Sequence, residues 1–555
     1  MIGFEHVGVT YAGASAPALH DVTLEVPEGE LVLVVGPTGS GKSTLLRTVN
    51  GLVPHFSGGT LTGRVTVDGL DTAEHRPRDL ATVVGLVDQN PASTFVTDVV
   101  EDEVAYGMET MGLHATAIRR RVEETLDLFG LTALRARPLG ALSGGQQQRV
   151  AIASLFAAGP RVLVLDEPTS ALDPVAAEEV LASLHRIVHD LGVTVVLAEH
   201  RLERVVHHAD RVVLVSEGRT SALLDPAEAM EVSQVFPPVV GLSRLAGWSP
   251  PPLSVRDARR RAAPLRARLD RASAAGRGDV PDGRDVRDGG AVPPLRAIGP
   301  SDAVVVEGAR VRRGGRVVVE GLDLTVARGS VTALMGRNGA GKSTLLGALV
   351  AQHELSAGRV RLGAAGVDPD AVSARERVRV VGLVPQQPEL LLYADTVAGE
   401  CADADRDFGV PAGSTAAVLD RVSRGVPADR HPRDLSEGQR LELALAVVLA
   451  GGPEVLLLDE PTRGLDYGAK QRLGLVLTEL AAAGTTVLLA THDVELAAEI
   501  ADRVVILADG EVVGDGPARD VLAASPAFAP QVTKVLLPQT WLTVAEVAAA
   551  LEETA

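Results

Sequence analysis

The sequence is short of cysteine, of long hydrophobic runs and of positive charge. Its single cysteine, Cys401, excludes intrachain disulfides and clusters of cysteine metal ligands, and it suits a reducing cytoplasm. The longest apolar runs, such as LALAVVLA at residues 443–450, are far shorter than the ~20 residues that a membrane span needs, and we see no signal pattern. A net charge of −19 argues against a general nucleic-acid binder, which would need a basic face. These features predict an acidic cytoplasmic protein.

Lysine is also scarce, at four of the 53 basic residues, and two of the four lie in near-identical loops. GPTGSGKST at residues 36–44 and GRNGAGKST at residues 336–344 match the phosphate-loop pattern GxxxxGK[ST]. Each follows an apolar run that predicts a buried strand and precedes a helix-like segment, as the motif requires. Backbone N–H groups of such a loop surround phosphate oxygens, and a slim lysine ammonium reaches the β- and γ-phosphates better than arginine would. The sequence therefore predicts two nucleotide sites.

The second half of the chain repeats the first well beyond this loop. VLVLDEPTSALD at residues 162–173 matches VLLLDEPTRGLD at 455–466, and TVVLAEH at 194–200 matches TVLLATH at 486–492. A period of about 290 residues indicates a duplicated domain rather than a solenoid.

The repeat sets the predicted domain boundaries. We predict domains at residues 1–258 and 303–555, joined by a flexible linker at 259–302. The linker begins with a segment of helical character and continues as a mixture of Gly, Asp, Arg and Pro. Its arginines could contact anionic lipid headgroups, but a solvated tether is favoured.

Two carboxylates end a predicted buried strand in each repeat. The first, Asp166 or Asp459, would hold Mg²⁺ through its water shell. The second, Glu167 or Glu460, would polarise the attacking water. An apolar strand that ends in Asp-Glu is a weak signal alone, but it becomes strong downstream of a phosphate loop.

Three further features gain weight because they occur twice. A glutamine after strand-like VGLV could sense both metal and attacking water, whereas alone it would be an ordinary turn residue. A histidine after the next apolar strand could hydrogen-bond the γ-phosphate, whereas alone it would be a surface histidine. LSGGQ at residues 142–146 offers a serine hydroxyl and glycine N–H groups at a predicted helix start, which is a second anion cradle.

The ordered set of phosphate loop, glutamine, LSGGQ, DEP, SALD and histidine resembles the ATP-binding cassette (ABC) family over both repeats. The resemblance implies an α/β fold with two tandem nucleotide-binding domains, each with a P-loop α/β core, an antiparallel β subdomain and a helical subdomain. It implies an ATPase that uses ATP and Mg²⁺. It also implies that the cassettes pack head to tail, so that each ATP lies between one phosphate loop and the LSGGQ of the other repeat.

The candidate residues fall into three groups. The catalytic candidates are Glu167, Glu460, His200, His492, Gln89 and Gln386. The Mg²⁺ candidates are Ser43, Gln89, Asp166, Ser343, Gln386 and Asp459. The nucleotide-binding candidates are Tyr11, Gly36, Pro37, Thr38, Gly39, Ser40, Gly41, Lys42, Ser43, Thr44, Gly336, Arg337, Asn338, Gly339, Ala340, Gly341, Lys342, Ser343, Thr344, Ser143, Gly144, Gly145, Gln146, Ser436, Gly438 and Gln439. By the same resemblance, Asp173 and Asp466 would link the two sites.

Two positions depart from the family's pattern. LSEGQ has Glu437 where the first copy has Gly144, and we expect the site to work at an altered rate. Tyr11 matches the aromatic residue that stacks on adenine. The corresponding position of the second repeat falls near Arg312 and Arg313, which could stack on adenine or belong to a solvated turn. We expect both sites to be active and unequal.

Three classes of ABC protein compete for the function: the cytoplasmic motor of a membrane importer, a protein that acts on ribosomes, and a repair ATPase. The linker is shorter than the charged helical arm of the ribosomal class and is broken by Pro and Gly. The zinc cysteines and long coiled coils of repair ATPases are absent from the sequence. Other ABC transporter classes, including sugar importers, remain alternatives, but the second cassette of sugar importers typically has a damaged site.

Finer resemblance favours one importer class. The segments at residues 51–72, 95–113 and 199–205 resemble the fused ATPase of energy-coupling factor (ECF) importers. Those importers take up vitamins, vitamin precursors or transition-metal ions in prokaryotes. The resemblance implies a peripheral protein on the cytoplasmic face of the membrane, with a transmembrane coupling protein and a substrate-binding membrane protein as partners. Cargo selection would lie in that second partner.

The acidic segment Asp98, Glu101, Asp102 and Glu103 is the predicted coupling surface, with Asp395 and Glu400 as a counterpart in the second repeat. In the family, arginine-bearing helices of the transmembrane partner dock in such grooves. The alternative is that Asp98 starts a helix whose first turn is merely solvated.

Overall fold

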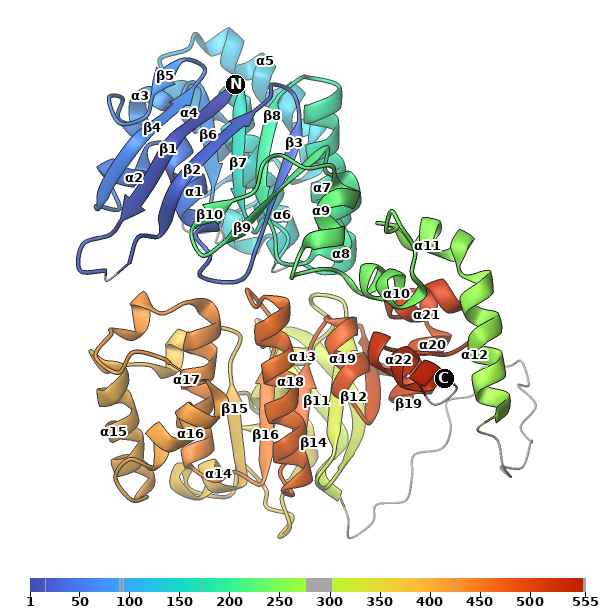
Figure 1. The fold of residues 1–555 in the computed structure, drawn as a ribbon. Helices are drawn as coiled ribbons and strands as arrows, with labels where there is room; N and C mark the ends of the chain where they lie inside the picture. The colour runs from blue at the N-terminus through green and yellow to red at the C-terminus, as the bar shows by residue number, and fades with distance from the viewer. Residues whose placement is uncertain are drawn as a thin grey trace. The chain divides into compact units, whose positions relative to one another are not determined.

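The structure is a computed structural model that describes residues 1–14, 16–88, 91, 94–170, 172–275, 302–423 and 425–552. The chain falls into two units, Met1–Ala258 and Arg259–Ala555, which run from blue to green and from green to red in Figure 1. Among the described residues, no helix combines the length and the apolar character that a membrane crossing requires.

The first unit contains two sheets. Its strands are β1 (Ile2–Thr10), β2 (Leu19–Val26), β3 (Leu31–Val35), β4 (Thr60–Val67), β5 (Leu70–Asp71), β6 (Val84–Val87), β7 (Val162–Asp166), β8 (Thr194–Ala198), β9 (Arg211–Ser216) and β10 (Arg219–Thr220). An antiparallel sheet has the order β2-β1-β4-β5, and a six-stranded sheet has the order β10-β9-β3-β8-β7-β6. The six-stranded sheet is parallel except for β10.

The described residues of the first unit also form eleven α-helices. They are α1 (Lys42–Val49), α2 (Leu52–His55), α3 (Pro77–Leu80), α4 (Val100–Thr110), α5 (Ala115–Leu128), α6 (Gly144–Ala157), α7 (Pro174–His189), α8 (Leu202–Val205), α9 (Pro226–Val232), α10 (Pro238–Ala246) and α11 (Val255–Arg261), of which α11 continues into the second unit. Helices α4, α5 and α6 contact one another and form a helical subdomain.

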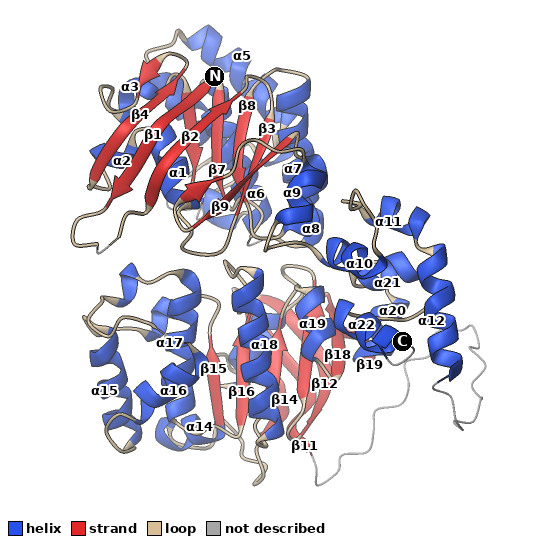
Figure 2. Cartoon of the chain, in the orientation of Figure 1, coloured by secondary structure: helices blue, strands red, loops and turns tan. Residues whose placement is uncertain are grey.

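The second unit repeats this plan (Figure 2). Its strands are β11 (Asp302–Arg313), β12 (Arg316–Ala327), β13 (Val331–Gly336), β14 (Leu355–Leu362), β15 (Val381–Val384), β16 (Val455–Asp459), β17 (Thr486–Ala490), β18 (Arg503–Ala508) and β19 (Glu511–Pro517). Its helices are α12 (Ala263–Ala275), α13 (Lys342–Leu349), α14 (Ala374–Val380), α15 (Val397–Phe408), α16 (Ser414–Val422), α17 (Glu437–Ala450), α18 (Tyr467–Ala482), α19 (Val494–Ile500), α20 (Ala518–Ala524), α21 (Gln531–Leu536) and α22 (Val544–Glu552). The sheet orders are β12-β11-β14 and β15-β16-β17-β13-β18-β19.

The apolar runs that indicated buried strands form the centres of the two parallel sheets. Every residue of β3, β7 and β8 is buried, as are those of β13, β16 and β17. A parallel strand is covered on both faces, so its sequence is continuously apolar rather than alternating. Since neighbouring parallel strands end at the same edge, the phosphate loop, the Asp-Glu pair and the histidine of each repeat meet at one edge of one sheet.

The segment predicted as a flexible linker opens with packed structure. Helix α12 contacts α22, and its Leu265 and Leu269 are buried. The Arg266 guanidinium donates a hydrogen bond to the carbonyl oxygen of Leu537 at 2.9 Å. Residues up to 275 therefore belong to the second unit, which corrects the linker start at 259. Residues 276–301 of the predicted linker lie outside the described residues, and its last residue, Asp302, begins β11.

Candidate nucleotide-binding and hydrolysis sites

Each phosphate loop joins a central strand of a parallel sheet to a helix that begins at the lysine of the motif, Lys42 in the first unit and Lys342 in the second. At Gly36 there is no room for a side chain, because a Cβ would lie 2.1 Å from the carbonyl oxygen of Val215. At Gly336 a Cβ would lie 2.4 Å from the carbonyl oxygen of Leu507. The first glycine of each loop is thus fixed by its close approach to the neighbouring strand, in the strand–loop–helix context that the sequence predicted.

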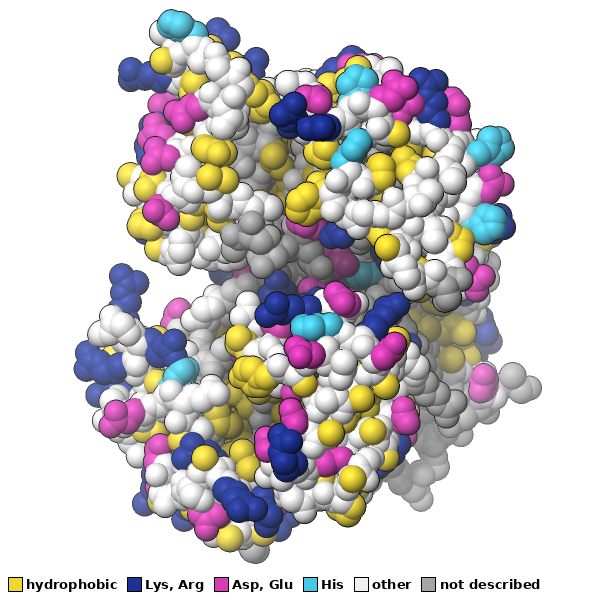
Figure 3. All heavy atoms as spheres, turned by 90° about the vertical axis from the view of Figure 1, so that its left-hand side faces the viewer, with side chains coloured by type: hydrophobic (Ala, Val, Ile, Leu, Met, Phe, Trp, Pro, Cys, Tyr) yellow, Lys and Arg dark blue, Asp and Glu magenta, His cyan; other side chains and the backbone are white. Residues whose placement is uncertain are grey.

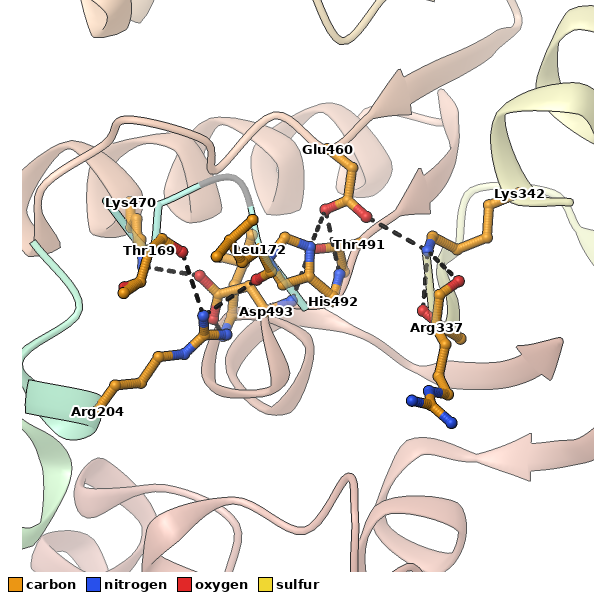
Figure 4. A network of polar contacts seen from close by, with 12 residues as sticks. Thr169, Leu172, Arg204, Arg337, Lys342, Glu460, Lys470, Thr491, His492 and Asp493 are labelled. Atoms are coloured by element: carbon orange, nitrogen blue, oxygen red, sulfur yellow. Dashed lines mark hydrogen bonds and ion pairs between the residues drawn. The ribbon is translucent and has the colours of Figure 1, made fainter. Parts of the chain in front are cut away.

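The two loop lysines are buried and point back into their own loops. Lys42 Nζ donates to the carbonyl oxygens of Gly36 and Pro37, at 2.8 and 2.9 Å. Lys342 Nζ donates to those of Gly336 and Arg337, at 2.8 and 3.3 Å (Figure 4). Each ammonium therefore lies inside the loop that would surround the phosphates.

A serine and an aspartate meet beside each phosphate loop. The hydroxyl of Ser43 is hydrogen-bonded to Asp166, and that of Ser343 is hydrogen-bonded to Asp459. Burial raises the pKa of both carboxyls above the usual range, while the serine hydrogen bonds act in the opposite direction. Oδ1 of each aspartate is buried and has no hydrogen-bond partner among the described residues.

This donor set fits Mg²⁺. The ion prefers oxygen ligands and usually binds through one or two protein groups together with substrate phosphates and waters. A cation at this place would also offset the burial of the carboxylate and use its unpartnered oxygen.

The predicted catalytic glutamates and histidines are in direct contact. In the first unit, His200 Nε2 lies 2.9 Å from Glu167 Oε1. In the second unit it is the other ring nitrogen, His492 Nδ1, that lies 2.6 Å from Glu460 Oε2 (Figure 4). All four side chains are buried. The histidine rings are therefore held by different atoms in the two cassettes, an asymmetry that the repeat alignment did not reveal.

Both glutamates also have unusual backbone conformations. Glu167 has a φ of 52° and Glu460 a φ of 49°, in the left-handed region that residues with a side chain rarely adopt. Each donates its backbone N–H to the strand that precedes the histidine, to Ala198 O at 2.9 Å and to Ala490 O at 2.8 Å. The strain is thus localised at the proposed base of each site.

The serines of the two signature motifs act as helix caps. Ser143 Oγ accepts the backbone N–H of Gln146 at 3.4 Å, and the Gln146 side chain accepts the N–H of Ser143 at 3.0 Å. Ser436 and Gln439 form the same capping box at the start of α17. The sequence predicted the helix starts but not these reciprocal bonds.

The structure explains why glutamate is tolerated in LSEGQ. A Cβ built at Gly144 would lie 3.9 Å from its nearest neighbour, a side-chain atom of Leu172, so the position has space. At Gly145 a Cβ would lie 2.5 Å from that of Ala176. Glycine is thus required at the second position of the pair and optional at the first, where the second repeat carries Glu437.

The proposed adenine-stacking residue lies at the phosphate loop. Tyr11 is half-buried, and its hydroxyl lies 3.2 Å from that of Thr44. In the second unit, Arg312 donates to the carbonyl oxygen of Gly315 within its own hairpin, and Arg313 contacts the ring of His353. Both arginines are exposed.

The glutamine predictions have different outcomes. Gln89 lies outside the described residues. Gln386 is exposed on the loop after β15. Asp173 and Asp466, predicted to link the two sites, cap helices α7 and α18, with Asp173 Oδ1 accepting the backbone N–H of Ala176 at 3.0 Å.

The predicted coupling surface needs a correction at two of its carboxylates. Glu103 is buried, and its Oε2 accepts the backbone N–H groups of Val96 and Thr97 at 3.1 and 2.8 Å. Glu400 is buried in the same way and accepts the N–H groups of two residues that precede α15. Burial removes Glu103 and Glu400 from any docking surface, and their hydrogen bonds hold the chain that precedes α4 and α15. Glu101 forms an ion pair with Arg135, at 3.0 Å, but its side chain is 46% exposed, so the prediction for it is not contradicted.

The comparisons with known proteins agree with this geometry. A family model described as ABC transporter matches residues 19–170 and 319–463. A Streptomyces coelicolor protein assigned as an ABC transporter ATP-binding protein is 60% identical, over 99% of this chain and 100% of its own length. A Methanosarcina mazei protein of the same description is 36% identical, over 94% of this chain and 90% of its own.

Among solved structures, CbiO1 of Clostridium perfringens, described as part of the ABC transporter complex CbiONQ, is 31% identical with a TM-score of 0.39, covering 42% of this chain and 90% of that one. The predicted α/β fold with two tandem cassettes is confirmed. The chain belongs to the ABC transporter ATP-binding family, and it carries two ATP-hydrolysing cassettes in one polypeptide.

Proposed function

We propose that this ATPase is the energy-coupling subunit of a prokaryotic ECF-type importer for a vitamin, a vitamin precursor or a transition-metal ion. The observation that carries the proposal is that both cassettes contain an intact buried Glu–His contact, Glu167–His200 and Glu460–His492. Neither site shows the damage typical of the second cassette of fused sugar importers. The ECF-like segments at residues 51–72, 95–113 and 199–205 support the finer assignment.

In each cassette we assign one role to each group. The lysine ammonium, Lys42 or Lys342, would leave its loop carbonyls and bind the β- and γ-phosphate oxygens. Glu167 or Glu460 would take a proton from the attacking water, because a buried carboxylate beside the phosphates is placed to act as a general base. The contacting histidine would hold both this carboxylate and the γ-phosphate.

Mg²⁺ would be held by Ser43 and Asp166, with Gln89, in one site and by Ser343 and Asp459, with Gln386, in the other. When bound there, it would neutralise the phosphate charge. The family's head-to-tail arrangement would complete each site with the capping serine and second glycine of the opposite signature motif, Ser436 with Gly438 and Ser143 with Gly145.

Membrane attachment would come through protein contact. Asp98 and Asp102 are exposed, and Val96, two residues before Asp98, is 61% exposed. In the second unit, Asp395 is exposed beside Tyr393, which is 83% exposed. At each of these two places, a basic helix of a transmembrane partner could contact exposed carboxylates and an exposed apolar or aromatic side chain. Opposite charges steer association more than they add affinity. On the face drawn in Figure 3, acidic and basic side chains are intermixed.

The proposal can be tested by sedimentation of membranes that contain the co-expressed transmembrane partner. Reversal of Asp98 and Asp102 to lysine should move the ATPase from the pellet to the supernatant while its ATP hydrolysis in solution persists. The matched control reverses Glu109 and Asp127, which are exposed on α4 and α5, and should stay in the pellet. Wild-type protein that sediments with ribosomes instead of membranes would support the ribosomal class and contradict the importer proposal.

A further inference from the structure

Glu199 is a buried carboxylate to which the proposed hydrolysis chemistry assigns no role. It directly precedes His200 and is 1% exposed. Its Oε2 accepts hydrogen bonds from the backbone N–H and the hydroxyl of Thr169, at 3.1 and 2.8 Å. Its Oε1 accepts the backbone N–H groups of His200 and Arg201, at 3.2 and 3.4 Å. One side chain thus joins a residue that follows Glu167 to the segment that carries His200.

Arg204 binds the segment 169–172 as well, through backbone carbonyl oxygens. Its guanidinium, on the short helix α8, donates from Nη1 to the carbonyl oxygens of Thr169 and Leu172, at 3.4 and 3.1 Å (Figure 4). Charge-assisted hydrogen bonds are stronger than neutral ones. We call the set of Glu199, Arg204, Thr169 and Leu172 the first-cassette latch.

The second cassette has different residues at the positions of the two charged groups. Thr491 stands where the first cassette has Glu199, and Leu496 stands where it has Arg204. Neither replacement can accept four hydrogen bonds or donate to a pair of carbonyls. The latch is therefore a property of the first cassette.

The polar contacts of the second cassette confirm that its arrangement differs. The hydroxyl of Thr462, which corresponds to Thr169, is buried and has no hydrogen-bond partner in the part of the chain that the structure describes. The segment after His492 is tied instead to α18, because Asp493 Oδ2 lies 2.8 Å from Lys470 Nζ (Figure 4).

Glu167 has a strained positive φ of 52°, as Glu460 has at 49°, and in the first cassette the latch residues are among the contacts that surround this strained backbone. Such conformations persist only where the neighbouring structure fixes them. The Glu167 carbonyl accepts a hydrogen bond from the hydroxyl of Ser170 at 3.1 Å, and Ser170 follows Thr169 directly. A displacement of Thr169 would therefore be transmitted to the backbone of Glu167.

We propose that Glu199 is the positioning residue of the first ATP site. Through its hydrogen bonds to Thr169, and together with Arg204, it keeps the Glu167 carboxylate in contact with the His200 ring. This inference rests on the catalytic role proposed for Glu167. Because the second cassette lacks the latch, the turnover of the two sites is expected to depend on different residues.

The test replaces latch residues by those of the second cassette, Glu199→Thr and Arg204→Leu, in a chain whose second site is silenced by Glu460→Gln. We expect kcat for ATP to fall at least about tenfold, since a misplacement of about 1 Å at a reacting group can cost about a hundredfold. The KM for ATP should change less than about twofold. Thr169→Val should lower kcat as well, and the double variant Glu199→Thr/Thr169→Val should be no slower than the slower single variant, since the two act through one contact.

The same substitutions in a Glu167→Gln chain provide the matched control, because there only the second site turns over and its kcat should not change. If Glu199→Thr fails to fold, Arg204→Leu carries the test, since Arg204 is only half-buried. Unchanged kcat in the Glu460→Gln chain would overturn the inference, as would a loss that is equal in both chains. Failure of the underlying assignment would look different: Glu167→Gln alone would keep wild-type turnover.

Discussion

Lys470 Nζ lies 2.8 Å from Asp493 Oδ2, and both side chains are at least nine-tenths buried. The ammonium also lies 5.5 Å from the centroid of the Tyr467 ring. Lys470 is one of four lysines in a chain that otherwise uses arginine, and it belongs to no recognised sequence motif. The structure shows it to be half of a buried ion pair that ties α18 to the start of α19.

This pair predicts an asymmetric effect of mutation. Lys470→Met should destabilise the protein by about 3 kcal/mol, because it leaves Asp493 charged and buried. Lys470→Met/Asp493→Asn should cost less than the single variant, since asparagine keeps the helix cap and removes the charge. Chemical denaturation followed by circular dichroism measures both. A double variant that is less stable than Lys470→Met would contradict the charge argument.

The signature motif predicts unequal effects of adding one methyl group. Gly145→Ala should destabilise the first cassette by about 1–3 kcal/mol, because the new Cβ would overlap Ala176 and the helix cannot shift freely. Gly144→Ala is the matched control and should be neutral or slightly stabilising, since the site has room and alanine favours a helix. Melting temperatures of the two variants measure the difference. Equal melting temperatures would show that Ala176 moves aside.

The buried thiol of the single cysteine, Cys401, should be protected from alkylation in a pH-dependent way. Burial, and then the nearby charges of Asp405 and Glu400, raise the pKa of the Cys401 thiol to about 11. The thiol is the unreactive form, so native protein should resist alkylation at pH 8–9, and its reaction should accelerate only as the pH approaches the raised value. Unfolded protein in denaturant is the control and should be labelled rapidly at pH 8–9. Fast labelling of the native chain would mean that the α15 region opens readily.

The shared-site arrangement predicts effects across the repeats. Ser143→Arg should inactivate the site that contains Lys342, although the two residues lie in different repeats. Nucleotide trapping with a photoreactive ATP analogue, followed by proteolysis between the cassettes, would show which site is affected. Ser436→Arg is the reciprocal variant and should act on the site that contains Lys42. Loss confined to the mutated repeat would contradict head-to-tail sharing.

Much of the fold was predictable because the relevant signals are local. The continuously apolar strands, the glycine loops and the strand-terminal carboxylates each have a short sequence pattern, and the duplication confirmed each pattern once more. The alignment of the two repeats also indicates that the position of Gly144 accepts a side chain, because the second repeat has Glu437 there.

The errors arise where a residue's role depends on contacts distant in sequence. Glu103 and Glu400 looked like exposed acidic residues at a helix start, but each folds back to accept backbone N–H groups six or seven residues earlier. The latch residues Glu199 and Arg204 were missed because their partners lie about 30 residues upstream. A comparison of the two repeats offered one usable signal, the exchange of Glu199 for Thr491 beside an unchanged histidine.

The most direct test of the account is ATP turnover by the purified chain and by its Glu167→Gln, Glu460→Gln and double variants, each with ATP binding measured in parallel. Glu109→Gln, an exposed residue of α4, is the control for loss of one carboxylate. The account predicts that each single variant loses turnover and that all of the variants still bind ATP. The double variant should lose at least about tenfold, because a positioned base typically contributes about a hundredfold or more. Wild-type turnover in the double variant would contradict it.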